Sequence, residues 1–334
     1  MTASTAVLAR AGERPATVIA RLARRNGYGI ALIGFLALMV VFTRVIHPSF
    51  GSRDLANLAS AAMPLAFAAA AQAVIVIAGG IDLSIGPMMA LTNVVAAVLM
   101  EALGDPASAG VVVLVLALGI GMGTINGGLV VTSRVPDIVV TLAMSFVWAG
   151  VALLILQRPD GNAADWFESL ARGPLVVDFL PKALVVLLAT VGLVWLPLRQ
   201  TRVGLSLYAI GSDRLAAYRS GVNVNRTKVV SYTLGGLFAA CGGLAITMTT
   251  GIGAPVPGDY TLAGVAAIVL GGVSLAGGRG GLVGPIAAAF ILALLRLDLI
   301  FLRVDPNLGL VIRGTIMVVV VMIGGFVTLR RLRA

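Results

Sequence analysis

Residues that could do chemistry are rare in this chain, and the densest group lies at residues 77–90, which read IAGGIDLSIGPMMA. Gly79 and Gly80 permit a tight turn with unusual backbone dihedral angles. Asp82 lies at membrane depth or at its rim, where a carboxylate is costly unless it is paired or faces water. Two interpretations are open: Asp82 caps exposed amides in a structural turn, with Ser84 capping the next helix, or this turn contacts a transported ligand.

Four further polar side chains lie inside long apolar segments: Gln72, Asn93, Asn126 and Thr141. Each is a candidate to line a polar passage between these segments. Each could equally make a hydrogen bond between helices, worth about 0.6–2 kcal/mol.

The residue inventory gives little support for catalysis by this chain. His47 and Cys241 are the single histidine and the single cysteine, so neither predicts a metal site. The only lysines, Lys182 and Lys228, do not follow a glycine-rich turn, so no phosphate-binding loop is predicted, and the run GGRGGLVG is read as a close-packed connection. A membrane-embedded enzyme would need acids with His or Lys at one membrane face, and neither Asp82 nor Asp137 has one beside it in the sequence. We therefore expect no catalytic residue, no metal and no bound cofactor.

The composition indicates which elements hold these residues. Of 334 residues, 59% are hydrophobic and 11% charged, with a mean hydropathy of +1.04. Soluble domains carry about 25% charged residues, so a soluble enzyme or nucleic-acid-binding domain is excluded. About 20 apolar residues cross a bilayer, and the sequence predicts an all-α membrane protein with about ten spans, some broken or kinked. The expected spans are 28–46, 58–79, 84–103, 108–132, 136–156, 180–198, 229–251, 260–276, 281–301 and 308–328.

The charge distribution predicts the orientation. The net charge is +10, and 16 of the 24 Lys and Arg residues fall on the side that carries the N-terminus, whereas most acidic residues fall on the other. Basic residues favour the cytoplasmic side, so both termini are predicted to be cytoplasmic. The expected organisation is an N-terminal arm (1–27), one transmembrane domain (28–328) and a basic tail (329–334). The charge sets topology, and no nucleic-acid partner is expected.

Two connections are long enough to meet a partner. The outer one, 157–179, could receive an external protein. The inner one, 199–228, is basic and predicts a short helix over residues 214–219, with Ser212 or Asp213 as its cap. From its residues alone, the inner loop is either a handle for a soluble subunit or a solvated basic loop.

Several motifs resemble those of a known family. Residues 79–86, GGIDLSIG, resemble the hallmark of the permease subunits of ABC importers for ribose, xylose and related monosaccharides. Segments 126–142, 201–224 and 270–284 resemble further family motifs in the expected order, and the resemblance extends over nearly the whole chain from about residue 30.

The resemblance implies a bacterial inner-membrane subunit that works as a pair, with a second copy or a different permease chain. A cytoplasmic ATPase would use ATP and Mg²⁺, and a periplasmic sugar-binding protein would deliver the ligand. The 199–228 loop would hold the helix that couples to the ATPase, through Gly211, Asp213, Ala216, Ala217 and Gly221. Alternatives are a permease for an autoinducer-2-like furanone or a polyol and, less favoured because deep acidic residues are scarce, a self-contained secondary transporter.

The chain departs from the family pattern at three places. It has Ser212-Asp213 where Gly-Asn is usual, and Asp137 where an aromatic residue is usual. Its ninth span contains Arg296 and Asp298, which are two residues apart and so lie on different helix faces. These charges either reach the membrane interface or contribute to ligand passage. The departures leave the identity of the sugar open.

Overall fold

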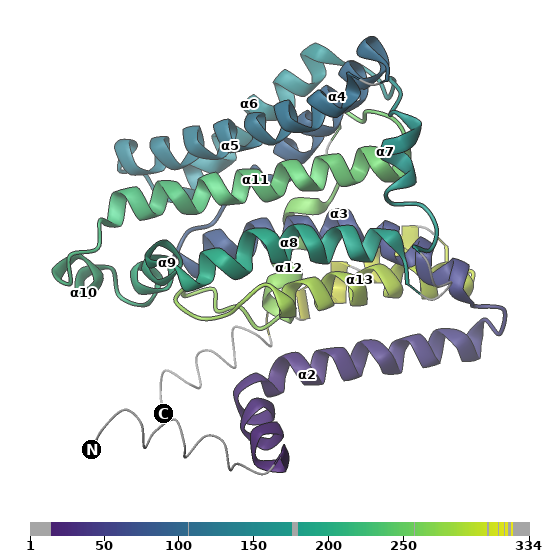
Figure 1. Ribbon diagram of the computed structural model, residues 1–334, viewed down its shortest axis with the longest axis horizontal. Coiled ribbons are helices and arrows are strands. Elements are labelled where there is room, and N and C mark those ends of the chain that lie inside the picture. The colour runs from purple at the N-terminus through teal and green to yellow at the C-terminus, as the bar shows by residue number, and fades with distance from the viewer. Residues whose placement is uncertain are drawn as a thin grey trace.

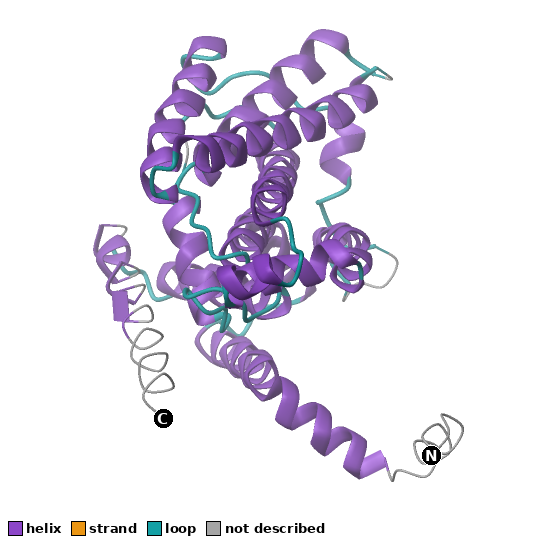
Figure 2. Ribbon diagram, turned by 90° about the vertical axis from the view of Figure 1, so that its left-hand side faces the viewer, coloured by secondary structure: helices purple, strands orange, loops and turns teal. Residues whose placement is uncertain are grey.

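The computed structural model describes residues 15–105, 107–175, 180–256, 258–305, 307–312, 314–316, 318–319 and 322. The regular elements among them are α-helices, beside two isolated β-bridges (Figure 2). Eight helices are long and apolar enough to cross a membrane: α2 (Pro15–Ile46), α3 (Ser52–Ile77), α4 (Ile85–Leu103), α5 (Ser108–Ser133), α6 (Asp137–Ile155), α8 (Lys182–Gln200), α11 (Val224–Thr250) and α13 (Val283–Phe301). The predicted all-α, polytopic fold class is confirmed.

The eighth predicted span, 260–276, is shorter than expected. Helix α12 (Tyr260–Leu270) has 11 residues, so it is about 16 Å long against a hydrocarbon core of about 30 Å. It ends because Gly271 packs against the start of α13, where an added Cβ would lie 2.3 Å from the Pro285 nitrogen, and because Gly272 adopts a positive φ of 77°. The tenth predicted span, 308–328, lies largely outside the described residues, as do the first residues of the arm and the tail. Helix α2 begins at Pro15, within the predicted arm, and its span-length apolar part is Gly29–Ile46.

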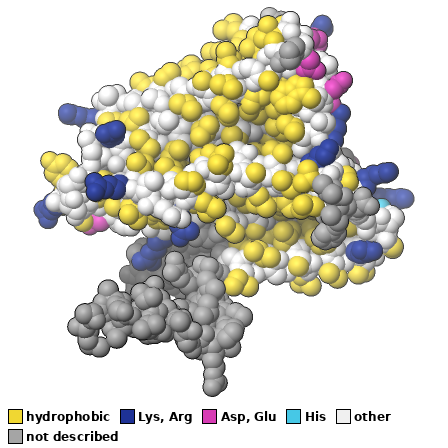
Figure 3. All heavy atoms as spheres, in the orientation of Figure 1, with side chains coloured by type: hydrophobic (Ala, Val, Ile, Leu, Met, Phe, Trp, Pro, Cys, Tyr) yellow, Lys and Arg dark blue, Asp and Glu magenta, His cyan; other side chains and the backbone are white. Residues whose placement is uncertain are grey.

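Helices α3, α4 and α11 form the buried centre, and α5 packs closely on α11 (Figure 1). Glycines allow this close approach: a Cβ on Gly119 would lie 2.5 Å from the Gly236 carbonyl oxygen, and one on Gly123 would lie 2.2 Å from that of Tyr232. Small residues at helix contacts are typical of membrane proteins. Figure 3 shows hydrophobic side chains covering the flank of the molecule, with charged side chains mostly at its two ends.

Two helix pairs are joined by extended segments that run within the helix bundle. One segment, 79–84, joins α3 to α4, and the other, 251–259, joins α11 to α12. Helices α4 and α12 begin side by side, because the Gly86 amide donates to the Thr261 hydroxyl at 2.9 Å. They then lead to opposite ends of the molecule: α4 ends near the loop that carries α7 (Asp165–Ser169), and α12 leads back to the end that carries α9 (Arg202–Ser212).

The short helix predicted in the inner loop is confirmed. Helix α10 (Arg214–Arg219) begins after Asp213, whose carboxylate accepts hydrogen bonds from the Leu215 and Ala216 amides at 2.9 Å. Asp213, and not Ser212, is therefore the cap. Helices α9 and α10 lie together at one end of the bundle, opposite α7 (Figure 1).

Candidate functional site

The segment 79–84 is held by buried hydrogen bonds around Asp82. The Ser84 amide and hydroxyl both donate to Asp82 Oδ1, at 2.7 and 2.6 Å. Asn126 of α5 donates to the Ser84 hydroxyl at 2.7 Å, and its own oxygen accepts from the Trp148 indole at 3.2 Å. Asp82 thus caps a backbone amide, as the structural interpretation expected. Ser84 occupies the cap position of α4 but makes no cap bond, because its hydroxyl is turned to Asp82.

A buried ion pair holds the other side of this segment. The Lys228 ammonium lies 2.6 Å from Asp137 Oδ2 and donates to the Gly79 carbonyl at 3.2 Å. The Tyr232 hydroxyl lies 3.1 Å from the Ile81 carbonyl and 3.0 Å from Asp137 Oδ2. We call these five residues the turn lock. Asp137 has no lysine beside it in the sequence, but the fold brings Lys228 to it.

Three glycines from distant segments meet at the C-terminal end of α3. Gly79 and Gly277 have positive φ angles of 73° and 85°, and a Cβ on Gly277 would lie 3.1 Å from the Gly79 Cα. A Cβ on Gly211, at the end of α9, would lie 1.9 Å from the Ile77 carbonyl oxygen. The same oxygen accepts from the Gly278 amide at 2.9 Å. The glycine-rich run after α12 is thus a close-packed connection, and α9 rests directly on the segment 79–84.

Tyr208 adds a side-chain contact at this junction. Its hydroxyl donates to the Gly280 carbonyl at 2.9 Å. Burial raises the pKa of the Tyr208 phenol, while the nearby Arg199 charge lowers it to a smaller extent. The phenol therefore remains a donor, and it ties α9 to the glycine-rich connection.

The predicted coupling residues divide into exposed and packed positions. Asp213, Ala216 and Gly221 are exposed, and Gly221 turns the chain after α10 with a φ of 83°. Ala217 is buried, and Gly211 is half-buried against α3. Only the first three can therefore touch a partner directly, while the other two hold α9 and α10 in place.

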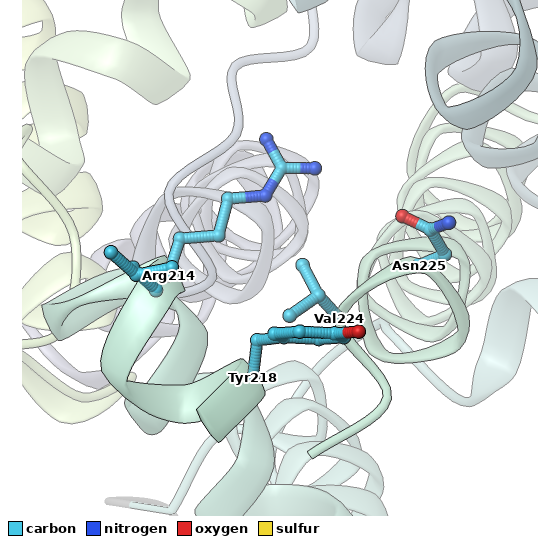
Figure 4. Close-up of a pocket in the computed structure, with 5 residues that line it drawn as sticks. Arg214, Tyr218, Val224 and Asn225 are labelled. Carbon is cyan, nitrogen blue, oxygen red and sulfur yellow. The ribbon is translucent and has the colours of Figure 1, made fainter. Parts of the chain in front are cut away.

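Sequence reasoning missed the exposed apolar side chains beside these positions. Leu215 and Tyr218 on α10 are 58% and 69% exposed. They border a hollow of about 350 Å³ lined by Arg214, Leu215, Tyr218, Val224 and Asn225, which we call the coupling surface. Figure 4 shows Arg214 and Tyr218 reaching from α10 toward the first turn of α11. The sequence signal that could have predicted this exposed surface was the presence of large apolar residues in a basic loop.

The four predicted passage residues do not come together. Asn93 donates to the Thr247 hydroxyl at 2.8 Å and the Ile252 carbonyl at 3.0 Å, and it accepts from the Ala254 amide at 2.7 Å. Asn126 and Thr141 both hold the segment 79–84, since the Leu83 amide donates to Thr141 at 3.1 Å. Gln72 differs: it is 1% exposed, and neither atom of its amide has a hydrogen-bond partner.

The two unusual charges of the ninth span have different surroundings. Asp298 is buried against α2 and accepts from the Thr43 hydroxyl at 2.7 Å. Arg296 is exposed and lines a cavity with Asp259 and Tyr260. The two side chains therefore have separate surroundings, as their positions on different helix faces predict.

Comparison with known proteins identifies related sequences. Residues 55–321 match the model of a family described as "Branched-chain amino acid transport system / permease component". The chain is 32% identical to the ribose import permease protein RbsC of Escherichia coli K12, over 88% of this chain and 92% of that protein. It is 32% identical to the fructose import permease protein FrcC of Rhizobium meliloti, over 76% of this chain and 72% of that protein. It is 28% identical to the autoinducer 2 import system permease protein LsrD of Escherichia coli O9:H4, over 92% of this chain and 94% of that protein. No solved structure matches the chain with statistical significance.

Proposed function

Since this chain belongs to the family of branched-chain amino acid transport system permease components and is a multi-pass membrane protein, we propose that it is the permease of an ABC importer for a monosaccharide. The observation that carries this proposal is the similarity to the ribose import permease over 88% of the chain. The family description names amino acids, but the relatives compared above are named for ribose, fructose and autoinducer 2. All three relatives favour a small polyhydroxylated ligand. Similarity to the autoinducer 2 permease supports a furanone or polyol as the alternative.

We assign one proposed soluble partner to each end of the molecule. An ATPase that uses ATP and Mg²⁺ would dock at the coupling surface on the cytoplasmic side, where the basic residues place both termini. A sugar-binding protein would dock at the opposite end, around α7 and the 157–175 loop. A second permease subunit, identical or different, would complete the transmembrane passage.

The structure supports a direct mechanical route from ATPase to passage. Helix α9 meets the end of α3 at Gly211, without a side chain between the two backbones. Helix α10 leads into α11, whose Lys228 bonds to the Gly79 carbonyl. A displacement of α9 and α10 would therefore move both sides of the segment 79–84. Gly79, Gly80, Asp82 and Ser84 would act as a structural turn that shifts with these helices.

Proteoliposomes with the permease, its ATPase and its binding protein test this function. We expect uptake of radiolabelled D-ribose or D-fructose that requires ATP and all three proteins. An ion gradient alone should drive no uptake. Uptake of L-leucine but of no sugar, or sugar uptake without the ATPase, would contradict the proposal.

The coupling surface is tested in the same system by Leu215→Asp combined with Tyr218→Asp. Both side chains are exposed, so the permease should insert normally but fail to retain the ATPase in detergent pull-down. The matched control, Leu215→Met with Tyr218→Phe, keeps the apolar contacts and should bind the ATPase normally. Equal ATPase binding by both double variants would exclude this surface as the docking site.

A further inference from the structure

A cavity of about 200 Å³ opens where α12 begins, between α3, α12 and α13. Ala61, Leu65 and Ala293 contribute small or apolar walls, and Asp259, Tyr260 and Arg296 contribute polar groups. We call it the α12 pocket. Pockets for drug-sized ligands begin at about 300 Å³, so this one suits a ligand of a single small ring.

The polar groups of the α12 pocket suit a polyhydroxylated ring. Asp259, Tyr260 and Arg296 all line this one small pocket, so the three groups lie close together. A guanidinium is a donor only and a carboxylate is an acceptor only, whereas sugar hydroxyls both donate and accept. The tyrosine ring adds an apolar face with a polar tip.

The pocket lies within the bundle rather than on the outer loops. Arg296 is 13 residues, or about 20 Å, from the start of α13 and five residues, or about 8 Å, from its end, so the pocket lies in the half of the bundle away from α9. Tyr260 precedes Thr261, whose hydroxyl accepts from the Gly86 amide at the start of α4. The pocket therefore adjoins the place where the two interrupted helix pairs meet. Discontinuous helices of this kind form substrate sites in many transporters.

Gln72 lies further along the same side of α3. With 3.6 residues per turn, Ala61, Leu65 and Gln72 lie within about 40° of one another around the helix axis. Gln72 is about 10 Å beyond Leu65 toward the coupling end. Between them α12 is in contact with α3, since a Cβ on Gly264 would lie 3.5 Å from the Ala68 backbone, an ordinary van der Waals distance. The unpaired Gln72 amide is thus the next polar group along this side of α3.

We propose that the α12 pocket is a low-affinity site for the monosaccharide inside the permease, with Tyr260 and Arg296 as its contacts and Gln72 as the following one. This inference rests on the proposed function, and it adds where the sugar binds within this chain. A weak site suffices because the binding protein has already selected the ligand.

The test compares Arg296→Gln and Tyr260→Leu in the complete transporter with D-ribose and D-fructose as probes. Docking and ATP hydrolysis occur elsewhere, so ATPase activity stimulated by the loaded binding protein should stay within about twofold. Sugar moved per ATP hydrolysed should fall about tenfold, while the concentration for half-maximal uptake, set by the binding protein, should not change. Arg303→Gln, beyond the end of α13, and Leu262→Ala, on the exposed side of α12, are the controls.

An unchanged ratio of sugar to ATP in both variants overturns the inference, and so does a parallel fall of uptake and ATPase activity. If the wild-type transporter moves no sugar, the proposed function fails and this inference fails with it. The two failures are therefore distinguishable.

A labelling experiment tests occupancy without relying on transport rates. The single native cysteine, Cys241, is buried, so Ala293→Cys introduces one accessible thiol into the pocket. A saturating concentration of D-ribose should slow its reaction with a polar thiol reagent at least about twofold. Ser133→Cys, exposed at the end of α5, should react at the same rate with and without sugar. Equal labelling rates of Ala293→Cys with and without D-ribose or D-fructose would overturn the proposal that the pocket binds sugar.

Discussion

The Lys228 ammonium lies 2.6 Å from the Asp137 carboxylate, near the start of α11, which follows α9 and α10 in the chain. The lysine side chain is 7% exposed and the aspartate side chain 21%, so water screens this pair weakly. The same ammonium bonds to the Gly79 carbonyl. The turn lock therefore connects α6, α11 and the segment 79–84 through one cation.

Removing this cation should leave a carboxylate in a partly buried site without its partner. Lys228→Met is expected to destabilise the protein by about 3–5 kcal/mol, as measured for broken buried pairs. Thermal unfolding in detergent, followed by loss of monodisperse protein, measures the effect. The double variant Lys228→Met with Asp137→Leu should recover most of the loss, because no charge is then unpaired. Equal melting temperatures for the single and double variants would contradict an ion pair that acts as a unit.

Gly211 should tolerate no side chain. In Gly211→Ala the new Cβ would overlap the Ile77 carbonyl oxygen, so α9 must move away from α3. We expect a lower melting temperature and a loss of sugar uptake per ATP hydrolysed. Gly128→Ala is the control, because nothing lies within 4 Å of its Cβ and alanine favours a helix by about 0.5–1 kcal/mol. Normal coupling in Gly211→Ala would show that the backbone contact transmits nothing.

Gln72→Leu should raise stability and lower transport. The buried amide makes no hydrogen bond, and an unsatisfied group of this kind costs about 1–3 kcal/mol. The melting temperature of the variant should rise, while uptake falls if the amide contacts passing sugar. A fall in melting temperature would mean that Gln72 has a polar partner in the folded protein.

Asn93→Leu should have the opposite effect on stability. Asn93 makes three hydrogen bonds that hold residues 247–254 at the end of α11, each worth about 0.5–1.5 kcal/mol. We expect the melting temperature to fall, and the 251–254 segment to exchange its amide hydrogens faster by mass spectrometry. Unchanged exchange there would rule out this clamp.

Two substitutions of Asp213 distinguish its effect as a helix cap from the effect of its charge. Asp213→Ala removes the cap of α10, which typically costs about 1 kcal/mol, whereas Asp213→Asn keeps a cap without the charge. If the cap alone matters, the alanine variant should bind the ATPase more weakly in pull-down and the asparagine variant should bind it normally. Weakened binding by both variants would assign the role to the carboxylate charge.

Features set by nearby residues could be predicted from the sequence. Helix α10 was predicted with its correct bounds, because Asp213 caps amides only two and three residues away. Most spans were predicted because a long apolar run is needed to cross a bilayer. The early end of α12 was not predicted, because it depends on how Gly271 packs against Pro285.

The candidate site could not be predicted in full, because it is made by contacts between residues that are far apart in the sequence. Lys228 and Asp137 lie on different helices, and only the unusual aspartate gave a signal. Gln72 and Asn93 look alike in the sequence, since each is an amide within an apolar run. Folding gives Asn93 three partners and leaves Gln72 with none, which no local pattern could distinguish.

The shortness of α12 has a consequence for how the protein is made. A helix of 11 residues cannot span the hydrocarbon by itself, and the extended segment before it exposes backbone groups that lipid cannot satisfy. The insertion machinery therefore cannot release α12 into lipid as a separate unit. Because α12 packs against α3 and α13, we expect it to enter together with α13, against an α3 already in place, so that synthesis of this part of the chain is coupled to its folding.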